Sequence, residues 1–239
     1  MCDRNIEVLS KLQMKIKYLT RKGMTIIVIL LFVHKIQAQE KFIPETTIGI
    51  KQGINISKVF FNPPIDQKIT TGYSGGIIFK HISQENLGIQ IELNFFQQGW
   101  TEKLDTTDSY FRRLNQINLS FMTHIELGKE ETKFLINLGP TLSYLISEKE
   151  SIKLINPKDA QTYYGEKINN ILEFGLCFGF GFVKTTPIGS FQFESRFNQN
   201  LSDIFRTVSD PTTSSSKIQS VELSISYLIK LKKTNRSNY

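Results

Sequence analysis

Alternation of apolar and polar residues with a period of two constrains the fold of this 239-residue chain more than any other feature. From Leu87 to Phe95, large apolar residues occupy every second position, and glycine or polar residues occupy the positions between them. Successive side chains of a β-strand point to opposite faces, so this stretch would have one apolar and one polar face as a strand. A helix would scatter the same apolar residues around its circumference. The pattern therefore predicts a β-strand.

The same alternation recurs, with occasional breaks, in eight stretches of the chain. These are residues 48–56, 73–79, 87–95, 117–127, 134–144, 172–182, 191–197 and 221–229. The links between them alternate in length, with short links at 83–86, 128–132 and 185–187 and long links at 58–72, 101–113, 147–167 and 198–216. An even number of strands joined in this way is typical of bacterial outer-membrane barrels, whose short turns face the periplasm. We therefore predict an all-β fold, an eight-stranded antiparallel up-and-down transmembrane β-barrel, within residues 39–239.

The apolar face could line the lumen or contact lipid, and the volume of its side chains decides between the two. Roughly three dozen large apolar side chains share this face, whereas an eight-stranded barrel encloses only packed side chains or one small ligand. The opposite face is rich in glycine, serine and amide residues, which suit a narrow interior. Apolar side chains on the outside of a barrel aggregate in water but are stable in hydrocarbon. The expected location is therefore the outer membrane.

The N-terminal region has the features of a secretory signal peptide. A basic segment beginning at Met14 precedes the apolar run Met24–Val33, and Ala38 is the expected last residue of the leader. The apolar run is much shorter than the roughly 20 residues that a membrane-spanning helix requires. We predict a cleaved signal peptide in residues 1–38. Met14 is an alternative start, because a leader from Met14 falls within the usual length of roughly 15 to 30 residues.

Most of the formal charge of +7 lies in this leader, which holds seven Lys and Arg residues against two Asp and Glu residues. Residues 39–239 hold 22 basic and 20 acidic residues, so nucleic acid is not an expected partner. Removal of the leader would also remove Cys2, and Cys177 alone could form no internal disulfide. We expect Cys177 to be a small apolar filler beside glycines.

Five segments combine glycine with strand alternation. They are GIKQGINISKV at 49–59, GYSGGI at 72–77, GIQIELNFFQQGW at 88–100, LGPTLSYLI at 138–146 and ESRFNQNLSDI at 194–204. In these segments, which cover most of residues 46–230, the chain resembles the PorT-like outer-membrane β-barrel family of Bacteroidetes. The resemblance implies an outer membrane protein β-barrel domain in the cell envelope. Some members of that family are linked to protein secretion across the outer membrane, so it also implies envelope or secretion proteins as partners, besides outer-membrane lipid.

Charged residues on the polar face would lie in a narrow lumen, where charges need partners of opposite sign. Five of them are expected to form a polar network: Lys51, Glu92, Glu194, Arg196 and Glu222. The simpler interpretation of this network is a salt-bridged plug. The alternative is a gated pore or a proton path.

Loops on a rigid scaffold often carry the residues that bind a partner. In the long link at 147–167, Tyr163 and Tyr164 are the candidates for such binding. The competing interpretation is a solvated loop without a ligand.

The sequence indicates no catalytic, cofactor-binding or metal site. A barrel hydrolase needs a histidine with Asp, Ser or Glu near the outer rim, but the strand order places His81 and His124 near the periplasmic ends of their strands. Two histidines on separate strands are also a poor set of metal ligands. The glycine-rich run GLCFGFGF at 175–182 lacks the spacing of a dinucleotide-binding loop and is interpreted as a strand.

Three functions are compatible with these observations. The leading one is a non-enzymatic, monomeric outer-membrane barrel that supports the envelope or binds a partner through its extracellular loops. The second is a narrow porin-like channel or an accessory component of protein secretion. The third is a soluble exported carrier of the lipocalin type, in which the apolar face would line the lumen.

Overall fold

The computed structural model describes residues 42–62, 64–104, 108–128, 131–155, 161, 163–168, 170–205 and 215–231. The chain divides into a unit of residues 1–42 and a unit of residues 43–239. The predicted signal peptide, residues 1–38, lies outside the described residues. Among the described residues, no helix is long and apolar enough to cross a membrane.

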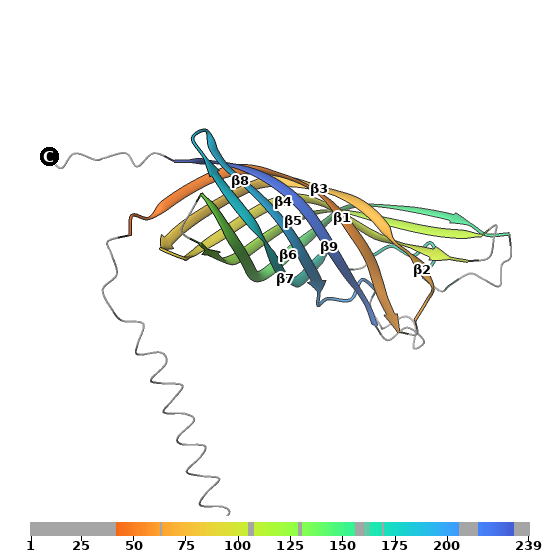
Figure 1. Cartoon of the computed structure of the whole chain (residues 1–239). Coiled ribbons are helices and arrows are strands. Elements are labelled where there is room, and N and C mark those ends of the chain that lie inside the picture. The colour runs from red at the N-terminus through yellow and green to blue at the C-terminus, as the bar shows by residue number, and fades with distance from the viewer. Residues whose placement is uncertain are drawn as a thin grey trace, which may run out of the picture. The chain divides into compact units, whose positions relative to one another are not determined.

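The described part of the second unit is a ring of antiparallel strands, seen from the side in Figure 1. The strands are β1 (Glu45–Asn62), β2 (Gln67–Lys68), β3 (Thr70–Gln84), β4 (Leu87–Lys103), β5 (Ser109–Leu127), β6 (Thr132–Lys153), β7 (Leu172–Thr186), β8 (Gly189–Asn200) and β9 (Ser215–Lys230). Each long strand pairs with its neighbours in the chain, and β1 pairs with β9 to close the ring. The fold is therefore the predicted eight-stranded antiparallel up-and-down barrel.

Two of the short links are tight turns at one end of the barrel. Glu85 and Asn86 form the turn between β3 and β4, and Pro187 and Ile188 form the turn between β7 and β8. The second turn ends at Gly189, whose φ of 151° is one that residues with side chains rarely adopt. The Thr186 hydroxyl donates a 2.6 Å hydrogen bond to the Gly189 carbonyl and closes this turn.

The strands extend further toward the long-link end than their apolar alternation predicted. β5 has 19 residues and β6 has 22, whereas the alternating stretches in these strands ended at residues 117 and 144 on that side. The two-residue strand β2, which was not predicted, lies in the first long link and pairs with β4 at Gln67 and Glu102. The long links are accordingly shorter than expected.

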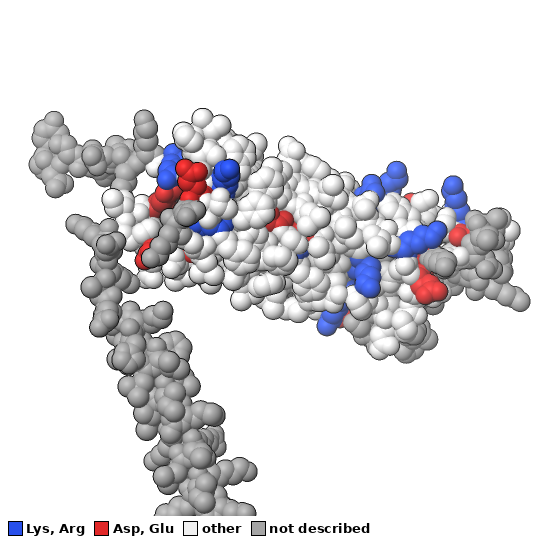
Figure 2. Space-filling model, viewed as in Figure 1, with Lys and Arg blue, Asp and Glu red and all other residues white. Residues whose placement is uncertain are grey.

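The apolar face points away from the barrel axis. Leu93, Phe178 and Ile225 are 45–46% exposed in the isolated chain, although they lie in the middle of their strands. Figure 2 shows the result as a broad, almost entirely uncharged band between charged residues at the two ends of the barrel. Since this band is favourable in hydrocarbon and not in water, the prediction of an outward apolar face is confirmed and the soluble carrier is excluded.

The polar and small residues alternate onto the inner wall. In β7, the two residues that follow Cys177 show the pattern, because Phe178 is exposed and Gly179 is buried. The Cys177 side chain is itself buried and donates a weak 3.4 Å hydrogen bond to the Gly139 carbonyl. The glycine-rich run is therefore a strand, as predicted, with its phenylalanines outside and its glycines inside.

Candidate functional site

A group of five charged side chains crosses the middle of the lumen. Lys51 comes from β1, Glu92 from β4, Glu194 and Arg196 from β8, and Glu222 from β9. These are the five residues that the sequence singled out as a lumen network, and we call them the plug network. Strand alternation puts each of them on the inner wall, and barrel closure brings strands together that are far apart in the sequence.

Arg196 is the centre of the plug network. Its Nη1 and Nη2 atoms donate to the two oxygens of Glu92 at 2.8 and 2.6 Å, a bidentate arrangement. Its Nε atom donates to Glu194 at 2.9 Å. Two carboxylates on different strands are therefore held by one guanidinium.

Lys51 connects the remaining carboxylate to this centre. Its ammonium group donates to Glu92 at 3.0 Å and to Glu222 at 2.9 Å. The Ser74 hydroxyl donates to the other oxygen of Glu222 at 2.5 Å. Glu92 thus joins both cations, because it accepts hydrogen bonds from Lys51 and from Arg196.

Amide side chains complete the surroundings of the network. Gln90 and Asn94, which flank Glu92 on the inner face of β4, donate to its two oxygens at 2.6 and 2.9 Å. Gln192 donates to Glu194 at 3.1 Å. These donors offset part of the excess negative charge, since the network holds three carboxylates and two cations.

The plug network is removed from water on all sides. The side chains of its five residues are at most 2% exposed. Gly179 on β7 makes room for one of them, because a Cβ atom at this position would overlap the carboxylate of Glu194. The middle of the lumen is therefore filled by paired charges.

A second polar cluster lies toward the short-turn end. The Lys80 ammonium donates to Glu126 at 2.9 Å, and Lys133 donates to the other oxygen of Glu126 at 3.2 Å. The fully buried His124 ring lies 3.0 Å from Glu126 and 2.6 Å from Asn137. His124 is therefore held between Glu126 and Asn137 and is too deeply buried to contact a dissolved substrate.

His81 is on the opposite side of the wall from His124. Its Nδ1 atom lies 2.8 Å from the Thr46 hydroxyl near the short-turn rim. The two histidines are therefore not brought together, and both lie near the short-turn end, where the sequence placed them. Within the described residues, no group of three or more His, Cys, Asp or Glu side chains could hold a metal ion.

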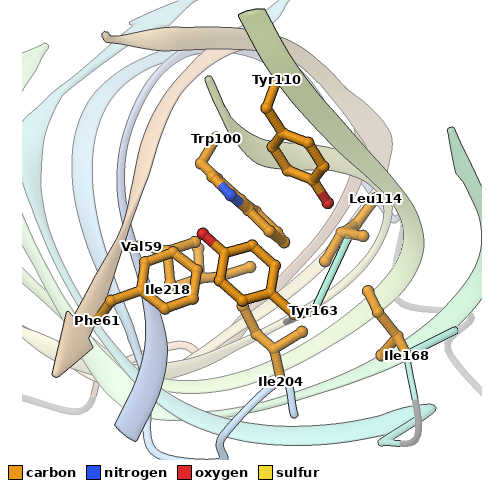
Figure 3. Close-up of a cluster of buried hydrophobic side chains, with 9 residues drawn as sticks. All are labelled: Val59, Phe61, Trp100, Tyr110, Leu114, Tyr163, Ile168, Ile204 and Ile218. Carbon is orange, nitrogen blue, oxygen red and sulfur yellow. The ribbon is translucent and has the colours of Figure 1, made fainter. Parts of the chain in front are cut away.

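The long-link end of the lumen holds a cluster of buried aromatic and aliphatic side chains, which we call the mouth cluster (Figure 3). Its members are Val59, Phe61, Trp100, Tyr110, Leu114, Tyr163, Ile168, Ile204 and Ile218. The strands supply six of them and the links between strands supply Tyr163, Ile168 and Ile204. Tyr163 stacks on Phe61 with ring centroids 5.2 Å apart, and its ring lies 6.5 Å from that of Trp100.

Hydrogen bonds fasten the link after β6 to this end of the barrel. The hydroxyls of Tyr163 and Tyr164 donate to the two oxygens of Glu102 at 2.6 and 2.5 Å, and the Trp100 ring nitrogen donates to Glu102 at 3.0 Å. The backbone amide of Gly165 donates to Glu150 at 3.0 Å. Three donors therefore converge on one inward carboxylate.

Burial changes the chemistry of Tyr163, which lies outside the membrane-spanning strands. Removal from water raises the pKa of its hydroxyl, and the hydrogen bond to Glu102 and the negative charge of that carboxylate raise the pKa further. The hydroxyl is thus held in its neutral form, in which it can donate.

The sequence predicted Tyr163 and Tyr164 as binding residues on an exposed loop, and the structure places them differently. Tyr163 is only 6% exposed and fills the mouth of the lumen. Tyr164 is half-buried and stacks on Tyr110 with ring centroids 4.0 Å apart. In this conformation both rings are occupied by contacts within the chain.

Arg112 and Glu102 are important residues of the mouth that the sequence analysis missed. The Arg112 guanidinium donates to Glu148 at 3.0 Å and lies over the rings of Trp100 and Phe205. The signal was present in the sequence, because Glu102 continues the inward phase of β4 after Gln98 and Trp100. It was overlooked because the residues between them are no longer apolar.

Comparison with known proteins agrees with the architecture. A family model described as "Outer membrane protein beta-barrel domain" matches residues 37–206, most of the chain. Comparison with curated protein sequences finds no match.

Three solved structures illustrate the likeness of the fold. Ail, the attachment invasion locus protein of Yersinia pestis, is 11% identical with a TM-score of 0.41, over 77% of this chain and 99% of Ail. The outer membrane protein OprG of Pseudomonas aeruginosa is 11% identical with a TM-score of 0.44, over 78% of this chain and 95% of OprG. Neisserial surface protein A is 15% identical with a TM-score of 0.41, over 77% of this chain and 97% of that protein.

Proposed function

This chain belongs to the family of outer membrane protein β-barrel domains, and from this premise we propose that it is a non-enzymatic barrel with a closed lumen. It acts as a structural or binding protein at the long-link end and does not conduct ions in its resting state. The shortness of the turns at the opposite end supports a long-link end that faces outward from the cell.

The observation that carries the proposal is the burial of the plug network. Ions and small solutes need a continuous aqueous path through a pore, and the charges that would line such a path here are paired with one another. Arg196 alone forms bonds to two carboxylates at 2.6–3.0 Å. The mouth cluster adds a second obstruction on the long-link side.

Current through planar lipid bilayers tests this proposal. The unchanged protein is expected to give no steady conductance, whereas combined replacement of Lys51, Arg196 and Glu222 by alanine should produce openings by removing the centre of the plug. Arg113→Ala on the outer wall is the control and should give none. A steady conductance in the unchanged protein would refute a closed lumen, and one that Arg196→Ala does not alter would also show that the plug network does not control it.

The positions of the histidines support a non-enzymatic role. His124 is fully buried beside Glu126, and His81 is on the outer wall near the short-turn rim. A general base must come within hydrogen-bond reach of its substrate, and the substrates of a surface enzyme arrive at the other end. Binding to partners therefore depends on the residues of the long links.

A narrow channel or an accessory role in protein secretion is the second candidate. The channel is favoured by the polar groups that follow one another along the lumen, from Lys80 through the plug network to Gln98, which donates to Gln116 at 2.8 Å. The secretion role rests on the resemblance to the PorT-like family. Crosslinking in intact cells, followed by identification of the captured proteins, distinguishes a secretion assembly from a barrel that acts alone as a monomer.

A further inference from the structure

The outer wall changes its chemistry beyond the apolar band at the long-link end. Outward residues there are first amides and hydroxyls, and neighbouring strands join them by hydrogen bonds. The Gln97 amide donates to Asn115 at 2.9 Å, and the Asn115 amide donates to Ser147 at 2.9 Å. This polar row marks the height at which the wall leaves hydrocarbon.

Basic side chains lie at and just above this row. They are Lys58 on β1, Arg113 on β5, Lys149 on β6 and Lys217 on β9, and we call them the basic collar. Lys58 lies on the outward face of β1 between Ile56 and Phe60, where the regular apolar alternation is first interrupted by a charge. Figure 2 shows several blue side chains and fewer red ones at this end, next to the mostly uncharged band.

Pairing of the strands groups these residues. Arg113 and Lys149 are direct partners across β5 and β6. Lys217 is the partner of Phe60, two residues from Lys58. Each pair therefore places two positive charges on neighbouring strands, an arrangement that costs energy unless an anion lies between or above them.

The basic collar has no carboxylate partners among the described residues. Lys58 lies over the Phe60 ring at 4.9 Å and Arg113 over the Phe111 ring at 5.1 Å. Arg113 also donates a long 3.4 Å bond to the Thr71 carbonyl, while its Nε atom has no partner. The guanidinium lies across β4 because Gly99, directly opposite Arg113, has no side chain.

Nearby acidic groups are directed elsewhere. Glu148 and Glu150 alternate with Lys149 on β6 but bind Arg112 and Tyr110 on the inner side. Asp66 and Glu166 are exposed and lie in links beyond the strands. The outward positions of the strands at this end therefore form a surface of one sign.

The short-turn rim is different, because its charges are of both signs and partly paired. Lys230 forms a 2.7 Å ion pair with Glu45, and Lys133 is bound to Glu126 at 3.2 Å. Among the described residues, the barrel is thus asymmetric, with positive charge that has no carboxylate partner at the long-link edge of the apolar band and partly paired charge at the short-turn edge.

We propose that the basic collar binds the phosphate groups of phosphorylated lipids in the external leaflet of the outer membrane. Phosphate groups of membrane lipids lie at the edge of the hydrocarbon, at the height where the collar lies. Arginine and lysine are the preferred ligands of phosphate, and aromatic rings beside the cations suit the membrane interface. Lipid acyl chains would then contact the apolar band below the same phosphate.

Native mass spectrometry of the refolded full chain tests this proposal, with a bisphosphorylated glycolipid of the lipid A type as the probe. The variant Lys58→Gln/Lys149→Gln/Lys217→Gln removes three charges from the collar. The matched control Lys133→Gln/Lys184→Gln/Lys230→Gln removes three from the short-turn rim. At about fivefold per charge, the collar variant is expected to bind the glycolipid on the order of a hundredfold more weakly.

Further arms of the experiment identify the ligand group. The unchanged protein should bind the dephosphorylated glycolipid far more weakly, and added salt should weaken binding of the phosphorylated form. Millimolar inorganic phosphate should not compete, because it lacks the acyl chains. Equal loss in the control variant, equal binding of the dephosphorylated probe or competition by free phosphate would each overturn the proposal. If the collar variant does not fold, the probe and salt comparisons on the unchanged protein decide.

Discussion

At the scale of single residues, Arg196 shows how a charge is tolerated inside a membrane protein. Its guanidinium is surrounded by carboxylates and satisfies two of them at once. Removal of one member of such a buried group is costly because the remaining charges lose their partner but stay buried. The consequence is that the plug network acts as one unit and not as a sum of separate bonds.

We expect Arg196→Gln to destabilise the folded barrel by about 3–5 kcal/mol, because three carboxylates would then face Lys51 alone. Urea unfolding in lipid vesicles measures this difference. The control Arg113→Gln removes an arginine from the outer wall and should shift the free energy of unfolding by no more than about 0.5 kcal/mol. An unchanged unfolding midpoint for Arg196→Gln would mean that the network does not contribute to stability.

At the scale of elements, the link after β6 behaves as part of the barrel wall. Its aromatic residues fill the lumen, and its backbone is bonded to Glu148 and Glu150 on the strand that precedes it. The protein has one tryptophan, Trp100, and this residue lies in the mouth cluster next to Tyr163. Its fluorescence therefore reports directly on the docking of this link.

Tyr163→Ala is expected to cost about 3–5 kcal/mol if the cavity that it leaves does not collapse. Water would then reach Trp100, so its emission maximum should move to longer wavelength. Tyr163→Phe keeps the ring and loses only the bond to Glu102, and should give a much smaller spectral change. Identical spectra for the alanine variant and the unchanged protein would show that the link is not docked in solution.

Docking of this link should also depend on pH in the alkaline range. Because the pKa of Tyr163 is raised in the folded state, its stabilising effect is complete below the pKa of an unfolded tyrosine, about 10, and declines as the pH rises above that value. Trp100 emission followed from pH 8 upward should change above about pH 10. Tyr163→Phe should weaken this transition, and an equal transition in that variant would assign it to other groups.

At the scale of the whole molecule, the sequence predicted what depends on local pattern. Period-two alternation is a local pattern that each stretch, such as 87–95, shows by itself. Together with the lengths of the links, it was enough to predict eight strands, their order and the outward apolar face. The ends of the strands were missed where the outer wall becomes polar, because Gln97 and Asn115 no longer contrast with their inward neighbours. The mouth cluster was missed because it joins Trp100 to Tyr163, which only the closed ring brings together.

The candidate site was likewise predictable in its residues but not in its geometry. The members of the plug network could be named from their inward phase, since charges in a narrow lumen have to find partners. Their geometry could not, because the distances between β1, β4 and β8 depend on strand tilt and register around the ring. Tyr163 was predicted to lie on an exposed loop because nothing in this polar, turn-rich link indicates that it packs against the mouth of the barrel.

Export of the chain and its insertion into the outer membrane can be tested on the whole protein. If residues 1–38 are a cleaved leader, the protein purified from outer membranes should have the mass of a chain that begins at Gln39. It should also migrate differently on gels before and after boiling, as a closed barrel resists detergent until heated. Recovery of the unprocessed chain in the detergent-free soluble fraction would contradict both export and insertion.

The length of β5 and β6 has a consequence for what the protein meets outside the cell. A strand needs about 9–11 residues to cross the hydrocarbon, so at about 3.3 Å per residue roughly half of the 22 residues of β6 rise beyond it. At the long-link end these two strands are held together by sheet hydrogen bonds up to the pair Ser109 and Lys153. In the orientation that we propose, a large particle that approaches the cell surface would meet these paired strand ends before it reaches the lipid.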